Sequence, residues 1–106
     1  MNDLTKKHCV PCETGEGKLD INKIKEYLPL THDWMLVGDT IKRDFKFKDF
    51  KEAMKFTNAV AKIAEEEGHH PDIYIFYNKV SLSLSTHAAK GLTENDFILA
   101  AKINAI

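Results

Sequence analysis

The chain has 106 residues, 43% of them apolar, which fits one compact domain. Its 15 basic and 16 acidic residues leave a formal net charge of -1 without a long run of either sign, so we expect no direct binding to nucleic acid. No apolar run approaches the roughly 20 residues of a membrane span, and the N-terminus lacks the apolar core of a secretory signal. These features predict a cytoplasmic protein that does not bind a membrane.

Residues 1–18 mix Lys, Thr, Glu, Gly and Pro without periodicity, so we predict a flexible N-terminal arm before a single domain over residues 19–106. The arm carries His8 and a Cys-x-x-Cys pair, Cys9 and Cys12. This pattern could be half of a zinc site or a redox pair, but no second Cys/His pair follows at a suitable spacing. In a reducing cytoplasm, two free thiols in a mobile tail are the simpler interpretation.

The first half of the domain predicts a short helix, a β-hairpin and a long helix. Helical spacing of apolar residues begins at Leu19 and stops at Pro29. A tight turn at Gly38-Asp39 separates predicted strands over residues 34–37 and 40–47. From Asp49 the helical period returns, and the expected core-facing residues are Phe50, Ala53, Met54, Thr57, Val60, Ala61 and Ala64.

The second half predicts another hairpin and a last helix. Strands are expected over residues 73–77 and 80–86, joined through Asn78-Lys79, and His87 follows on the polar face of the second strand. Thr93 and Asp96 form the pattern of a capping box, in which each side chain satisfies a free amide at a helix start. Together the elements predict an α+β fold, a four-stranded antiparallel sheet with three helices on one face.

The strand over residues 73–77 is apolar on both faces, unlike its serine-rich neighbour. Helices on one side of a sheet bury only one of those faces. A second copy of the chain is the simplest cover for the other face, so we predict a homo-oligomer.

Three histidines are candidates for a catalytic site. Gly68 and Pro71 end the long helix and place His69 and His70 in a helix-to-strand turn, and antiparallel pairing brings the strand end at His87 toward the same place. Imidazoles exchange protons near neutral pH, which suits acid and base roles on one substrate. Glu65 lies one helical turn before His69 and could orient an imidazole.

Other interpretations of these residues stay open on pattern alone. Neighbouring histidines in a loop are often solvated surface, and the glutamates at 65–67 fit a charged helix face. A metal site is also an alternative, although neighbouring residues in extended backbone point apart, so three ligands would have to come from separate places. Asp96 is explained more simply as a helix cap than as a catalyst.

The ordered motifs of the second half are similar to the signature of the pterin-4a-carbinolamine dehydratases. They are Gly68-His69-His70-Pro71, Tyr77-Asn78-Lys79-Val80, Leu84-Ser85-Thr86-His87, and Gly91-Leu92-Thr93 with Asp96. The resemblance extends upstream to Trp34 and to residues 47–50. It implies a homodimer or tetramer, no metal and no cofactor.

The resemblance also implies a reaction, the dehydration of 4a-hydroxytetrahydrobiopterin to quinonoid dihydropterin. It implies catalytic roles for His69, His70 and His87, and contact of Glu65, His70 and Asp96 with the substrate. The pathway implied is recycling of the pterin cofactor of aromatic amino acid hydroxylases, with coupling to phenylalanine hydroxylase. The alternative implied by some relatives is a protein-binding module that acts as a dimerisation partner or coactivator of a transcription factor.

Overall fold

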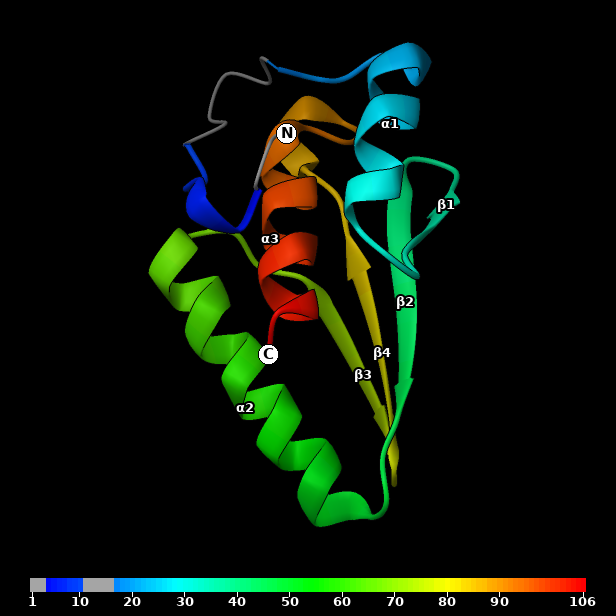
Figure 1. Cartoon of the computed structure of the whole chain (residues 1–106), viewed down its shortest axis with the longest axis vertical. Coiled ribbons are helices and arrows are strands. Elements are labelled where there is room, and N and C mark those ends of the chain that lie inside the picture. Colours follow the sequence, from blue (N-terminus) through cyan, green and yellow to red (C-terminus); the bar gives the residue numbers. More distant parts are fainter. Residues whose placement is uncertain (1–3, 11–16) are drawn as a thin grey trace.

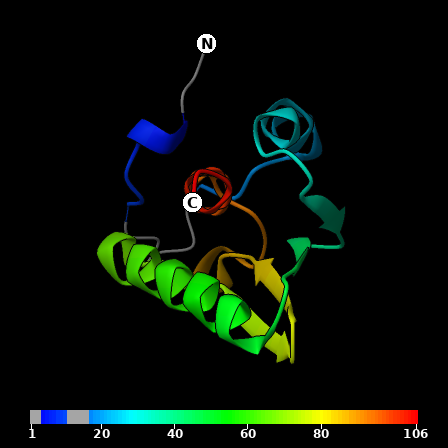
Figure 2. The same ribbon diagram turned by 60° about the horizontal axis from the view of Figure 1, so that its bottom comes forward.

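The structure, a computed structural model, describes residues 4–10 and 17–106. One antiparallel sheet has the strand order β1-β2-β4-β3. Three α-helices cover one face of this sheet, with α3 between α1 and α2 (Figures 1 and 2). The elements are η1 (Leu4–Lys6), α1 (Ile21–Tyr27), η2 (Leu28–Leu30), β1 (Met35–Val37), β2 (Thr40–Lys46), α2 (Phe50–Glu67), β3 (Asp72–Phe76), β4 (Lys79–Leu84), η3 (His87–Ala89) and α3 (Glu94–Asn104). The predicted fold class is confirmed.

The centre of the core is the contact between β4 and α3. Val80, Leu82 and Leu84 alternate along β4 and are fully buried, as period-2 spacing predicts for one face of a strand. In α3, eight of the eleven residues are buried, so this helix is enclosed by the rest of the fold. No helix of the described ranges is long and apolar enough to cross a membrane.

Helix α2 is turned slightly from the orientation that the sequence predicts. The buried residues are Ala53, Thr57, Val60 and Ala64, as expected. Phe50 and Ala61, however, are exposed, whereas Phe56 and Ile63 pack on the core. The Phe56 ring lies 4.5 Å from that of Phe45, centroid to centroid. Aromatic packing against β2 therefore selects the buried face, which the alanine-rich stripe alone did not define.

The second hairpin and the end of β4 also differ from the prediction by small shifts. Phe76 pairs with Lys79, so the turn is Tyr77-Asn78, one residue earlier than predicted, with Tyr77 at φ 52°. Strand β4 ends at Leu84, and Thr86 makes only an isolated bridge with Gly91. His87 consequently begins the short η3 turn rather than ending a strand.

The described part of the N-terminal stretch packs on the domain. Leu4 is buried in the core cluster, and Lys102 Nζ donates to the Thr5 carbonyl at 2.9 Å. The expectation of an arm apart from the core is therefore wrong for residues 4–10. Cys12 and the other residues of 11–16 lie outside the described part, so the prediction for the Cys-x-x-Cys pair stays untested.

Candidate active site

The candidate site lies where the last turn of α2, the start of β3, η3 and the start of α3 gather at one end of the molecule (Figure 1). Gly68 ends α2 in the left-handed conformation, with φ 66°, a position that suits glycine because it has no Cβ. Its amide and that of His69 both donate to the Ala64 carbonyl. The predicted helix-to-strand turn thus carries His69 and His70, as expected.

A buried carboxylate anchors His69. The Oδ1 atom of Asp96 lies 2.6 Å from His69 Nε2, and its Oδ2 accepts from the Thr86 hydroxyl and the Thr93 amide, each at 2.9 Å. Asp96 is 0% exposed, and the hydroxyls of Thr86 and Thr93 are 2.9 Å apart. The capping box at the start of α3 is confirmed, and its carboxylate has two further partners, His69 and Thr86, that the sequence did not reveal.

This arrangement fixes which nitrogen of His69 is available to other groups. A carboxylate oxygen accepts a hydrogen bond, so the neutral imidazole carries its proton on Nε2 toward Asp96. The other nitrogen, Nδ1, then holds a lone pair. Since the ring is mostly buried and held at one nitrogen, His69 can act as a proton acceptor through Nδ1 without reorienting.

His70 has a different partner and a different environment. Its Nε2 lies 2.9 Å from Glu65 Oε2, and both side chains are largely exposed. Glu65 therefore orients an imidazole, as the sequence suggested, but that imidazole belongs to His70 rather than to His69. An exposed pair of this kind is weak and easily rearranged by a bound molecule.

His87 is exposed beside a shallow cavity of about 310 Å³. The other lining residues are Asp39, Thr40, Ser85, Thr86, Lys90 and Gly91. Thr86 lines this cavity, and its hydroxyl donates to Asp96, whose other oxygen bonds His69. The cavity and His69 are therefore connected through Thr86 and Asp96. The three histidines thus come from adjoining segments, with His69 connected through Asp96 to the residue that precedes His87.

Glu67 differs from its predicted status as a solvated charge. Its side chain is only 6% exposed, and its carboxylate accepts from the Cys9 amide at 2.8 Å and pairs with His8 Nδ1 at 2.9 Å. Burial raises the pKa of Glu67. The Cys9 amide, His8 and Lys102 together lower the pKa by more than burial raises it, so the pKa lies below its ordinary value. No pattern in the sequence separates this glutamate from Glu65 and Glu66.

Residues 4–10 and 17–106 contain no group of three or more His, Cys, Asp or Glu side chains suited to a metal ion. At the candidate site, His69, Asp96, Thr86 and Thr93 form one hydrogen-bonded set.

Comparison with known proteins places this geometry in a family. Residues 17–106 match the family described as pterin 4 alpha carbinolamine dehydratase. The chain belongs to this family. A relative from Alkaliphilus metalliredigens, whose name assigns it to pterin-4-alpha-carbinolamine dehydratase, is 44% identical over 106 residues and covers 98% of this chain and 96% of its own. A relative of the same name from Legionella pneumophila (strain Corby) is 47% identical over 108 residues, with 99% and 96% covered.

Solved structures agree with this assignment. The crystal structure of a transcriptional coactivator/pterin dehydratase from Brucella melitensis superposes with a TM-score of 0.80 at 38% identity, over 84% of this chain and 97% of that one. A pterin dehydratase-like protein described as a RuBisCO assembly factor in the alpha-carboxysome gives a TM-score of 0.61 at 25% identity, over 72% and 90%. The family resemblance inferred from the sequence is confirmed, and with it the enzyme class, a dehydratase of the hydro-lyase type.

Proposed function

We propose that the protein dehydrates 4a-hydroxytetrahydrobiopterin to quinonoid dihydropterin by histidine acid and base catalysis. The observation that carries the proposal is the anchoring of His69 by the buried Asp96, within a chain of the pterin dehydratase family. In the reaction the N5 lone pair expels the 4a hydroxyl, which leaves as water once protonated. A base takes the N5 proton, so C4a and N5 become doubly bonded.

The proposed roles follow from the surroundings of each histidine. His69, held at Nε2, offers Nδ1 as the base for the N5 proton. His87, exposed beside the cavity, supplies a proton to the leaving hydroxyl. His70 with Glu65 holds the pterin ring or its side chain through polar contacts at the exposed edge of the site. No metal or redox cofactor enters this scheme.

Asp96 takes a positioning role in the proposal rather than the direct contact with substrate expected from the sequence. Both of its carboxylate oxygens are engaged by protein donors, and it is fully buried. A substrate would reach it only by displacing His69 or Thr86. Its effect on the pterin therefore passes through His69.

The test is the rate of carbinolamine dehydration by the wild type and by His87→Ala, followed by stopped-flow absorbance. General acid catalysis contributes about 10²- to 10⁴-fold, so the variant is expected to lose at least about 10²-fold in kcat. His32→Ala is the matched control, because this exposed histidine lies outside the site and its backbone carbonyl, which the substitution keeps, accepts the bonds from Arg43 and Asn104. Unchanged turnover in His87→Ala would remove the acid role.

The protein is also proposed to form a homo-oligomer, a dimer or a tetramer, through the open face of the sheet. Tyr74 and Phe76 lie on this face of β3 and are 52% and 62% exposed, and Met35 of β1 is exposed as well. Exposed aromatic side chains in one strand mark a surface that another protein covers. Within the proposed pathway the enzyme acts after phenylalanine hydroxylase, in the cytoplasm.

A protein-binding role is the second candidate. The related Brucella melitensis protein is described both as a transcriptional coactivator and as a pterin dehydratase. Capture of a transcription factor by purified protein that fails to dehydrate the carbinolamine would favour the binding role over catalysis.

A further inference from the structure

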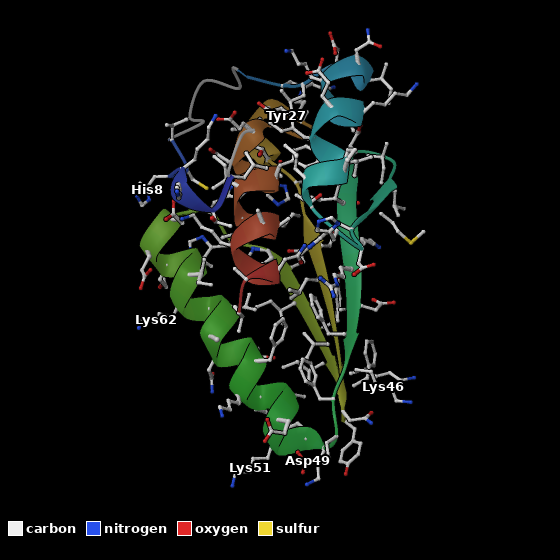
Figure 3. The ribbon with its side chains drawn as sticks, viewed as in Figure 1. His8, Tyr27, Lys46, Asp49, Lys51 and Lys62 are labelled. Carbon is white, nitrogen blue, oxygen red and sulfur yellow. The ribbon has the colours of Figure 1, made fainter. Side chains whose placement is uncertain are left out.

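The N-terminal segment, Leu4–Val10, bridges the end of α2, which leads into His69, and the start of α3, which carries Asp96. In Figure 1 it lies beside the last turn of α2 and the start of α3, and Figure 3 shows His8 at that end of α2. Leu4 fixes one end of the segment in the core. The segment is thus seated at the candidate site, although it precedes the residues 17–106 that match the family.

On the α2 side, the segment holds Glu67. The Cys9 amide and His8 Nδ1 each bond one oxygen of its carboxylate, and Lys102 Nζ of α3 lies 3.6 Å from the oxygen that faces His8. Glu67 is the last residue of α2, two positions before His69. A carboxylate this buried needs its partners, because an unpaired buried charge is costly.

On the α3 side, the segment holds Asn95 and Glu94. The Val10 amide donates to Asn95 Oδ1 at 3.0 Å, and Asn95 Nδ2 donates to the Val10 carbonyl at 2.6 Å. Lys7 Nζ pairs with Glu94 at 3.1 Å. Asn95 directly precedes Asp96, so the segment bonds residues close in the chain to each partner of the His69–Asp96 pair.

We propose that the N-terminal segment is a positioning element of the active site, which fixes the end of α2 relative to the start of α3 and thereby keeps His69 in line with Asp96. The inference rests on the proposed function of His69. In this proposal Glu67 and Asn95 are positioning residues. They do not contact the substrate, but their replacement lowers kcat because His69 loses its fixed position. Misplacement of a catalytic group by about 1 Å can cost as much as 10²-fold in rate.

The test compares two variants that release the segment from opposite sides, Glu67→Ala and Asn95→Ala. Glu66→Ala is the matched control, since Glu66 is an exposed neighbour in the same turn of α2. Amide hydrogen exchange at Cys9 and Val10 reports whether the segment is released. In both test variants we expect faster exchange and a kcat about 10-fold lower with KM within about 2-fold, since the binding groups remain in place.

A second readout does not depend on activity. The tautomer of the His69 ring, read from its ¹⁵N resonances and assigned with His69→Gln, is expected to be fixed in the wild type and in Glu66→Ala, and averaged in the test variants. If the wild type lacks dehydratase activity, the proposed reaction fails, and this spectrum still decides whether the segment positions His69.

Stability alone would not reproduce this pattern. A purely structural role of the segment predicts a lower melting temperature, with full turnover per folded molecule and an unchanged His69 spectrum. Released Cys9 and Val10 amides together with wild-type kcat and an unaltered His69 tautomer would overturn the proposal. If Glu67→Ala does not fold, Asn95→Ala carries the same test, because it keeps the Glu67 side chain and removes only the side chain that bonds Val10.

Discussion

Replacing Asp96 by asparagine tests the centre of the proposed site with almost no change in volume. The Thr93 amide donates to one carboxylate oxygen and is fixed by the start of α3, so the single oxygen of the introduced side chain must stay at that position. The amide nitrogen of the introduced side chain then faces His69 Nε2 and presents a donor where Asp96 presented an acceptor. His69 must accept at Nε2 and carry its proton on Nδ1, which removes the lone pair assigned to the N5 proton.

Two magnitudes follow from this exchange of donor and acceptor. The same reversal of an imidazole tautomer in the serine protease triad lowers kcat about 10⁴-fold, so we expect a loss between about 10² and 10⁴ here. The charge-assisted bonds of the carboxylate become neutral ones, which costs about 1 to 2 kcal/mol. At about 4 to 8 °C per kcal/mol for a small domain, the melting temperature falls by roughly 4 to 16 °C.

The assay combines stopped-flow dehydration at saturating carbinolamine with thermal unfolding followed by circular dichroism. Asp49→Asn is the matched control, because Asp49 caps α2 through the Glu52 amide at the opposite end of that helix from His69. It is expected to lose some stability and to keep kcat. If Asp96→Asn turns over as fast as the wild type, His69 does not act through the tautomer that Asp96 imposes, and the base must be another group.

Three further substitutions separate binding, stability and assembly. Glu65→Gln weakens the exposed pair with His70, so steady-state kinetics should show KM raised about 3- to 10-fold at nearly constant kcat. Denaturant unfolding should show that the free energy of unfolding falls by less than about 0.5 kcal/mol. A changed kcat with constant KM would contradict the holding role. Hydrogen bonding to Glu94 raises the pKa of Tyr27 to about 12, so the pair stabilises the fold below about pH 10 and this contribution is lost as pH rises to about 12. Tyr27→Phe should therefore show a smaller fall in melting temperature across that window than the wild type, and an equal fall would refute the coupling. Tyr74→Glu places a charge on the open sheet face, and light scattering after size-exclusion chromatography should show a smaller assembly, whereas an unchanged mass would place the interface elsewhere.

Local patterns predicted most of the fold because each element begins or ends with a strong signal. The return of the helical period at Asp49, with Gly68 and Pro71, defined α2 and the turn that follows it, and strand alternation identified the buried side of β4. The buried face of α2 was harder to predict from the sequence, since Phe50 and Phe56 are equally apolar. The positions of Phe45 and Phe47, whose rings contact Phe56, decide that Phe56 and not Phe50 packs on the core.

The site was predicted as a set of residues but not as a set of contacts. Nothing in the sequence states that the carboxylate of a capping box has an oxygen left to hold a histidine 27 positions away. Glu67 was missed for the same reason. Its burial depends on Cys9 and His8, which lie 58 and 59 positions away in a stretch without periodicity.

The buried Asp96 joins the folding of α3 to the chemistry proposed for His69. A helix start exposes free amides, and Asp96 satisfies the Thr93 amide through one oxygen while its other oxygen holds the imidazole. Since α3 is the most enclosed helix, its first turn is a rigid support for a catalytic group. Changes that loosen this turn should therefore affect activity before they unfold the domain, because kcat depends on the placement of one ring whereas unfolding requires loss of the whole core.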